Sequence, residues 1–141
     1  MNKKQKEIIL YIVFGVSTTA VNWIIYTLLT LVLQVGMTLS NGIAWGGAVL
    51  FAFVTNKLFV FESKSMKWCI VFKEALLFVG ARIFSGVFEV FLPTALVMIG
   101  LNQKLWGIDG FWAKVLVSVL VVILNYVVSK TLVFVKKVQD A

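Results

Sequence analysis

The sequence predicts an all-α integral membrane protein with four transmembrane helices. Of its 141 residues, 61% are of hydrophobic types and only 13% are charged, whereas soluble domains average about 45–50% and about 25%. A chain this short, folded in water, has too little interior to bury so much apolar surface. Four stretches are each long and apolar enough to cross about 30 Å of hydrocarbon. The chain is therefore predicted to be one membrane domain over residues 1–141.

The first span is predicted over about residues 10–33. It is too long for the apolar core of a signal peptide, and no small-residue cleavage site follows it, so we expect it to remain a span. After a short uncharged turn, the second span is predicted over about residues 39–61. Small residues at every fourth position, from Ser40 through Ala52 to Asn56, give it a face that another helix can approach closely.

The third and fourth spans are predicted over about residues 70–99 and 111–135. The third contains Pro93, the only proline in the chain. Proline has no N–H, so the carbonyl of Glu89, four residues earlier, loses its helical partner. We therefore expect a kink in the third span near Glu89. The fourth is mostly apolar but contains Lys114 and Asn125.

The distribution of basic residues predicts the orientation. Ten of the thirteen cations lie before the first span, around the connection between the second and third spans, or at the end of the fourth. They are Lys3, Lys4, Lys6, Lys57, Lys64, Lys67, Lys73, Lys130, Lys136 and Lys137. The positive-inside rule then places both termini in the cytoplasm and the chain in the cytoplasmic membrane. Because anionic headgroups account for the net charge of +7, no nucleic-acid partner is predicted.

The ends of the two return spans are similar in sequence. Residues 56–61 and 129–134 carry Lys, Val and Phe at matched offsets. Because both predicted hairpins begin on the same side of the membrane, a duplication would be a parallel repeat. Lys57 and Lys130 lie one turn from the span ends, so we expect their side chains to extend toward the headgroups.

Three charged residues lie at membrane depth: Arg82 and Glu89 in the third span, and Lys114 in the fourth. A charge at mid-bilayer costs at least about 2.5–3.5 kcal/mol, so each needs a partner. Arg82 and Glu89 share a helix face with Ser85, but they are about 10 Å apart along the axis, which is long for a direct pair. Two cations and one carboxylate leave one positive charge, which suits a ligand such as a phosphodiester. Neutralisation of the cations by Glu89 is the alternative.

The remaining polar residues offer fewer kinds of chemistry. Asn56 and Asn125 either hold helices together or contact a ligand, and the pattern favours neither. The chain has no histidine and a single cysteine, Cys69, which excludes His-based catalysis and any disulfide or thiolate zinc site within one chain. We therefore expect no metal and no cofactor.

Several motifs together resemble the GtrA-like family over about residues 10–137. They are Ala52-x-x-x-Asn56-Lys57-x-x-Val60-Phe61, Phe78-x-x-x-Arg82, Lys114 and Leu124-Asn125-Tyr126-x-x-Ser129-Lys130-x-x-x-Phe134. The resemblance implies movement of polyprenyl-phosphate-linked sugars across the cytoplasmic membrane, for glycosylation of cell-surface polysaccharide or teichoic acid. The family's polar signature falls on Asn56, Arg82, Lys114 and Asn125, with Ala52 and Phe78 packing beside them. Many relatives have an acidic residue where this chain has Asn22.

With this resemblance, the sequence predicts a lipid-linked sugar flippase and not an enzyme. Arg82 and Lys114 would bind the lipid phosphate, and Asn56 and Asn125 would bind the sugar or the phosphate. Glu89 would neutralise Arg82 or accept a hydrogen bond from a sugar hydroxyl. Pro93 would pack near this site. The expected partners are the anionic polyprenyl-phosphate sugar, membrane glycosyltransferases of the same pathway, and a second copy in a dimer. The alternatives are a non-catalytic partner that stabilises a glycosyltransferase and a small multidrug-type exporter. Composition alone also leaves room for an enzyme acting on a polyprenyl phosphate.

Overall fold

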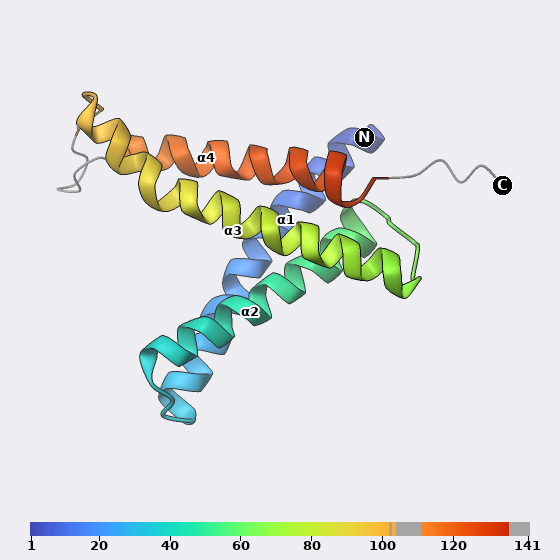
Figure 1. Ribbon diagram of the computed structural model, residues 1–141, viewed down its shortest axis with the longest axis horizontal. Coiled ribbons are helices and arrows are strands. Elements are labelled where there is room, and N and C mark those ends of the chain that lie inside the picture. The colour runs from blue at the N-terminus through green and yellow to red at the C-terminus, as the bar shows by residue number, and fades with distance from the viewer. Residues whose placement is uncertain (102, 104–110, 136–141) are drawn as a thin grey trace. The chain divides into compact units, whose positions relative to one another are not determined.

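The fold is all-α over the part of the chain that the structure describes. The computed structural model describes residues 1–101, 103 and 111–135, and none of these forms a strand. The elements in order are α1 (Lys3–Thr27), η1 (Leu28–Val32), α2 (Met37–Thr55), η2 (Asn56–Val60), α3 (Trp68–Met98), α4 (Phe111–Val128) and η3 (Ser129–Val133), where η denotes a π-helical turn (Figure 1). The predicted helical fold class is confirmed; Lys136 and Lys137 lie outside the described residues.

Four helical segments are long and apolar enough to cross a membrane. They are Lys3–Val32, Met37–Val60, Trp68–Met98 and Trp112–Val133. The first begins several residues before the predicted boundary, because the helix continues through a polar turn that a hydropathy argument leaves out. The side-chain Oε1 of Gln5 accepts a hydrogen bond from the backbone N–H of Asn2 at 3.0 Å, which caps the start of α1.

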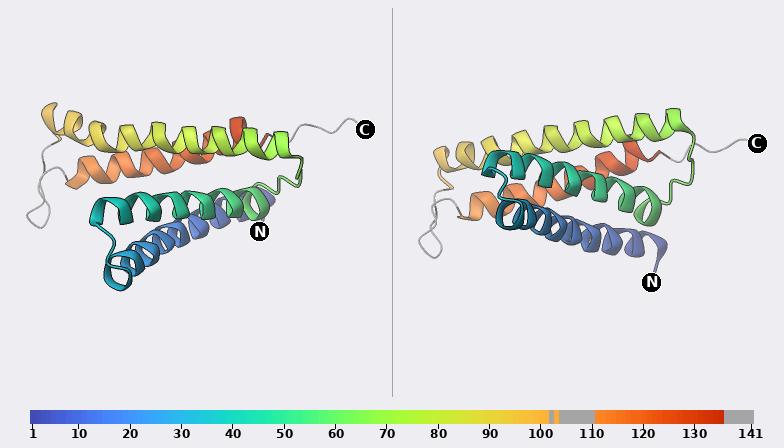
Figure 2. Two further views of the ribbon diagram at one scale, coloured as in Figure 1. Left: turned by 60° about the horizontal axis from the view of Figure 1, so that its bottom comes forward. Right: turned by 90° about the horizontal axis from the view of Figure 1, so that it is seen from below.

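The chain divides into two compact units, Met1–Met66 and Lys67–Ala141. In the first, α1 and α2 form an antiparallel pair, here called the first hairpin (Figures 1 and 2). A glycine allows their close approach: a Cβ on Gly47 would lie 2.6 Å from Cδ1 of Ile25. Near the chain's start, the ring centroids of Tyr11 and Phe61 are 6.3 Å apart.

In the second unit, α3 and α4 form the second hairpin (Figure 2). Helix α3 continues through Pro93 to Met98. Gly100 follows two residues later, and its φ of +115° lies in the left-handed region that glycine adopts without strain. The ring centroids of Phe78 and Phe134 are 6.0 Å apart, so an aromatic pair joins α3 to the end of the return helix here too.

Both return helices end in a π-helical turn. The N–H of Phe61 donates to the carbonyl of Asn56 at 2.9 Å, and the N–H of Phe134 donates to the carbonyl of Ser129 at 2.8 Å. These turns coincide with the two segments of matching sequence, residues 56–61 and 129–134. π-turns are rare and are frequent at functional sites. The parallel repeat and the cytoplasmic termini remain predictions.

Candidate functional site in the two membrane hairpins

Arg82 lies in the middle of α3, where its side chain is half-buried. Its guanidinium carbon is 5.2 Å from the ring centroid of Phe78, one helical turn earlier. Phe78 is only 1% exposed and packs in turn on Phe134. The four-residue spacing of the Phe78-x-x-x-Arg82 motif therefore produces a cation–π contact on a fixed ring.

The other residues of the Arg82 stripe lie on α3 as the helical period predicts. Ser85 is buried, and its Oγ donates to the carbonyl of Arg82 at 3.1 Å. Glu89 is exposed, and Pro93, half-buried, follows one turn later. Among the described residues, Arg82 and Glu89 make no ion pair with each other or with any other side chain. The second hairpin therefore leaves this cation without a neighbouring counterion.

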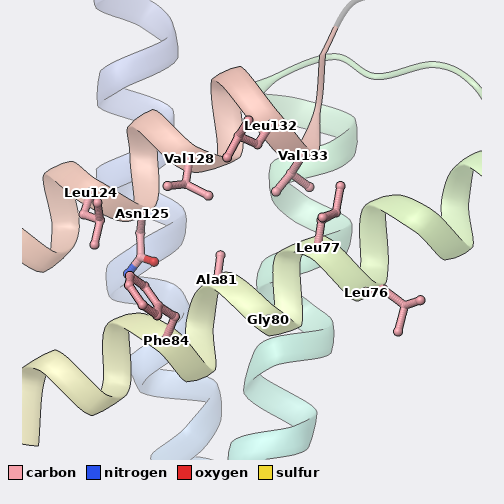
Figure 3. A pocket seen from close by; sticks show the side chains of 10 residues that line it. All are labelled: Leu76, Leu77, Gly80, Ala81, Phe84, Leu124, Asn125, Val128, Leu132 and Val133. Carbon is pink, nitrogen blue, oxygen red and sulfur yellow. The ribbon is translucent and has the colours of Figure 1, made fainter.

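Asn125 of α4 lies in the wall of a pocket of about 360 Å³ between α3 and α4. The pocket is lined by Leu76, Leu77, Gly80, Ala81, Phe84, Leu124, Asn125, Val128, Leu132 and Val133. Figure 3 shows the amide of Asn125 extending from α4 toward the ring of Phe84. Asn125 is 5% exposed, and its amide forms no hydrogen bond with any described residue. It is a buried polar group in apolar surroundings.

Arg82 and Lys114, the two cations predicted to bind phosphate, lie at different depths. Ala81 and Phe84 of α3 share the pocket wall with Asn125, so Arg82 is at about the same depth as Asn125. Lys114 is exposed and precedes Asn125 by eleven residues, which corresponds to about 16 Å along the helix axis. The hairpin thus brings Arg82 and Asn125 to one depth and keeps Lys114 apart.

In the first hairpin, the motif Ala52-x-x-x-Asn56 forms a side-chain to backbone hydrogen bond. Nδ2 of Asn56 donates to the carbonyl of buried Ala52 at 2.6 Å. Asn56 is 2% exposed, and its Oδ1 has no hydrogen-bond partner among the described residues. One end of the amide is thus held in place, while the other is a buried acceptor without a donor.

The two matched lysines differ in their surroundings. Lys130 is exposed, as expected for a side chain that extends toward the headgroups, and its ammonium lies 3.1 Å from the hydroxyl of Tyr126. Lys57 is instead 3% exposed, and its Nζ donates to Oγ of Ser63 at 3.2 Å. Lys57 is therefore part of the protein interior and not a surface residue.

The sequence reasoning missed a buried carboxylate, Glu74, which is 5% exposed on α3. A signal for it was present in the sequence. Lys73-Glu74-x-x-Leu77-Phe78 repeats the pattern of Lys6-Glu7-x-x-Leu10-Tyr11 at the start of the first hairpin. In both hairpins, the aromatic residue that ends this pattern packs against the end of the return helix.

These features define a multi-pass membrane protein of four apolar helices, with a cation and two amides in its hairpins. A family profile described as the GtrA/DPMS transmembrane domain matches residues 10–134. The chain belongs to this family, as the sequence motifs predicted.

Similar proteins occur in several bacteria. The chain is 40% identical to the cell wall teichoic acid glycosylation protein GtcA of Listeria monocytogenes serovar 1/2a, over 91% of this chain and 84% of that protein. It is also 40% identical to the protein of that name from Listeria innocua serovar 6a, with the same coverage. The uncharacterized membrane protein YwcD of Bacillus subtilis is 34% identical over 93% of this chain and 98% of its own length. No solved structure matches the chain.

Proposed function

We propose that this protein moves a polyprenyl-phosphate-linked sugar across the cytoplasmic membrane, for glycosylation of a cell-surface polysaccharide or teichoic acid. It acts as a translocator and not as an enzyme. The names of the relatives from Listeria support the pathway, because those proteins are named for cell wall teichoic acid glycosylation. The observation that carries the proposal is Arg82, a cation in the middle of an apolar helix with no counterion among the described residues.

A phosphodiester supplies the counterion that Arg82 lacks. A guanidinium forms paired, charge-assisted hydrogen bonds with phosphate oxygens, and these are about twice as strong as neutral ones. The ring of Phe78 restricts the guanidinium to one side of α3 before the ligand arrives. A half-buried arginine in a membrane helix is costly, and an anionic lipid that enters from the bilayer offsets this cost without leaving its hydrocarbon tail unsolvated.

The different depths of the cations favour successive contacts with the phosphate. Lys114 is about 16 Å from Asn125 along α4, so a phosphate bound at Lys114 has to move about half the thickness of the hydrocarbon core to reach the depth of Arg82. Asn125 at that depth, and the free acceptor of Asn56 in the first hairpin, offer hydrogen bonds to a phosphate or to sugar hydroxyls. Glu89 is exposed and about 10 Å from Arg82 along α3, so its role in the proposal is to accept a hydrogen bond from a sugar hydroxyl.

The proposal includes an assembly and an orientation. Both termini lie in the cytoplasm, the working form is a homodimer because four spans enclose little volume, and the product passes to membrane glycosyltransferases. Cross-linking of the protein in mild detergent tests the assembly. Recovery of the monomer alone, at concentrations where a known dimer is cross-linked, would contradict it.

The function is tested by reconstitution in liposomes with a polyprenyl-phosphate sugar in one leaflet, measuring the headgroups exposed on the other. We expect Arg82→Gln and Lys114→Gln each to slow transfer by about 10- to 100-fold, the effect of losing one hydrogen bond to a charged group. Lys73→Gln is the matched control, because Lys73 is also an exposed cation of the second hairpin and lies near the start of α3. We expect it to transfer at the wild-type rate.

The same variants separate this proposal from a non-catalytic partner of a glycosyltransferase. Such a partner would support full decoration of the cell envelope with Arg82→Gln and Lys114→Gln, as long as both proteins reach normal levels in the membrane. Full decoration by both variants, together with unchanged transfer in liposomes, would overturn the phosphate-binding role.

A further inference from the structure

The pocket between α3 and α4 combines an apolar wall with one unsatisfied polar group. Nine of its ten lining residues have no polar side-chain atom. The tenth, Asn125, is 5% exposed, and its amide has no partner among the described residues. In Figure 3 its amide lies at the Phe84 end of the pocket, while Leu76 and Leu132 line the other end. The polar group is thus at one end of an apolar pocket.

This arrangement specifies the chemistry of an occupant. The Asn125 amide has no hydrogen bond in these apolar surroundings, so a ligand that supplies an acceptor or donor at that point is favoured. The rest of the pocket suits only hydrocarbon. At about 360 Å³, its volume is at the low end of the range of about 300–1,000 Å³ for small-molecule sites. A ligand with a hydrocarbon chain and an oxygen atom at its end fits these requirements.

We infer that the pocket binds the head-proximal units of the polyprenyl chain, with the Asn125 amide bonded to the oxygen that joins this chain to phosphate. This inference rests on the proposed function for the identity of the lipid. The lining supports it, because the other nine lining residues have no polar side-chain atom and Asn125 is the one side chain of the wall that bonds an oxygen. The shape supports a branched chain, since Gly80 and Ala81 leave space in the middle of the wall where methyl branches fit.

Chain binding and charge binding are separable in this arrangement. Arg82 is not part of the pocket wall. On α3 it is two residues from Phe84, which lines the pocket, so the two side chains leave the helix on nearly opposite sides, about 160° apart. A neutral polyprenol, which has the chain and the oxygen but no phosphate, therefore binds the pocket without help from Arg82.

Gly80→Leu fills the pocket without disturbing the helix. A Cβ at Gly80 meets no atom within 4 Å, so the backbone accepts a side chain. Removing a glycine from a helix interior also favours the helix. Gly86→Leu is the matched control, because Gly86 lies in the same helix, has the same open surroundings and does not line the pocket. Asn125→Leu removes the polar group at nearly constant volume.

The test uses the full-length purified protein in lipid nanodiscs and a polyprenol with a photoreactive group beside its hydroxyl. After illumination, peptide mapping locates the label. We expect labelling of residues 76–84 and 124–133, reduced at least about fivefold by Gly80→Leu and about threefold to tenfold by Asn125→Leu, the effect of one hydrogen bond. Gly86→Leu and Arg82→Gln should label like the wild type. Excess unlabelled polyprenol or polyprenyl phosphate should prevent labelling.

Three results would overturn the inference: labelling outside the two segments, equal labelling of Gly80→Leu and Gly86→Leu, or equal labelling by a straight-chain alcohol probe. The last would identify the occupant as the acyl chain of an ordinary membrane lipid. Failure of the proposed function is recognised separately. If polyprenol labels the pocket but the reconstituted protein transfers no lipid-linked sugar, the pocket assignment stands and the translocator proposal fails.

Discussion

The contact between Phe78 and Arg82 can be measured as a coupling energy. Phe78→Leu keeps an apolar side chain but removes the ring face that Arg82 covers at 5.2 Å and the ring pair with Phe134 at 6.0 Å. Because Phe78 is 1% exposed, neither water nor lipid fills the space of the lost ring. We expect the second hairpin to be destabilised and the Arg82 guanidinium to lose its fixed position.

The expected magnitude follows from these two contacts. A cation–π contact contributes about 0.5–1 kcal/mol at exposed sites and about 2 when desolvated, so for half-buried Arg82 we take about 1 kcal/mol. An aromatic pair contributes about 0.5–1.5 kcal/mol beyond its buried area. Phe78→Leu should therefore lower the free energy of unfolding by about 2 kcal/mol. A double-mutant cycle of Phe78→Leu with Arg82→Met should return a coupling of about 1 kcal/mol.

The assay is unfolding of the purified protein by sodium dodecyl sulfate in mixed micelles, followed by tryptophan fluorescence. The matched control is the cycle of Phe78→Leu with Lys114→Met, which also removes a cation of the second hairpin. Lys114 lies twenty residues before Phe134 on the return helix, about 30 Å along the axis, so the coupling should be zero. Equal couplings in the two cycles would refute the conclusion that the ring of Phe78 holds Arg82.

Two further predictions concern the first hairpin. Asn56→Leu should leave the free energy of unfolding within about 1 kcal/mol of the wild type while slowing sugar transfer in liposomes. The substitution removes the hydrogen bond to Ala52, but it also removes a buried oxygen without a donor, and the two effects offset each other. A large loss of stability would mean that this oxygen has a structural partner. Gly47→Leu should destabilise the protein by about 1–3 kcal/mol through overpacking against Ile25, with Ile25→Ala restoring most of it in the double variant. Gly46→Leu, where a Cβ meets nothing within 4 Å, should be nearly neutral, and a similar cost at both glycines would contradict the close approach of α1 and α2.

The transmembrane spans were predictable because a single property, the length of a continuous apolar stretch, determines them. A bilayer selects continuous apolar stretches of about 20 residues, and this signal is strong for each of the four helices. The early start of α1 was not predictable in this way, since Lys3, Lys4 and Lys6 are polar and are helical only because the segment continues an apolar helix into water. A hydropathy argument finds the part of a helix that lies in lipid and misses the part that extends beyond it.

The candidate site was predictable by residue type and not by contact. The cost of a charge or amide in lipid identifies Arg82, Asn56 and Asn125 from the sequence alone. Helical periodicity placed Arg82 and Glu89 on one face, but the contact of Arg82 with a ring one turn earlier depends on its rotamer. The burial of Lys57 depends on the packing around it, whereas proximity to a span end suggested a surface position. Rotamers and packing are tertiary properties that spacing does not encode.

The two hairpins differ in the residue that lies one turn after their first aromatic ring. The aromatic pairs Tyr11–Phe61 and Phe78–Phe134 occupy equivalent positions in the two hairpins. In each pair, the first ring follows a Lys-Glu dipeptide and the second ring follows a π-helical turn. One turn after the first ring the chain has Gly15, whereas one turn after the second it has Arg82.

The amides are likewise displaced between the hairpins. The first has Asn56 at the start of its π-helical turn, and the second has Asn125 one turn earlier. In the first hairpin the amide is held by the Ala52 carbonyl and presents a single acceptor. In the second it lies in a pocket at the depth of a cation. Two similar scaffolds therefore carry unlike polar groups at their amide positions.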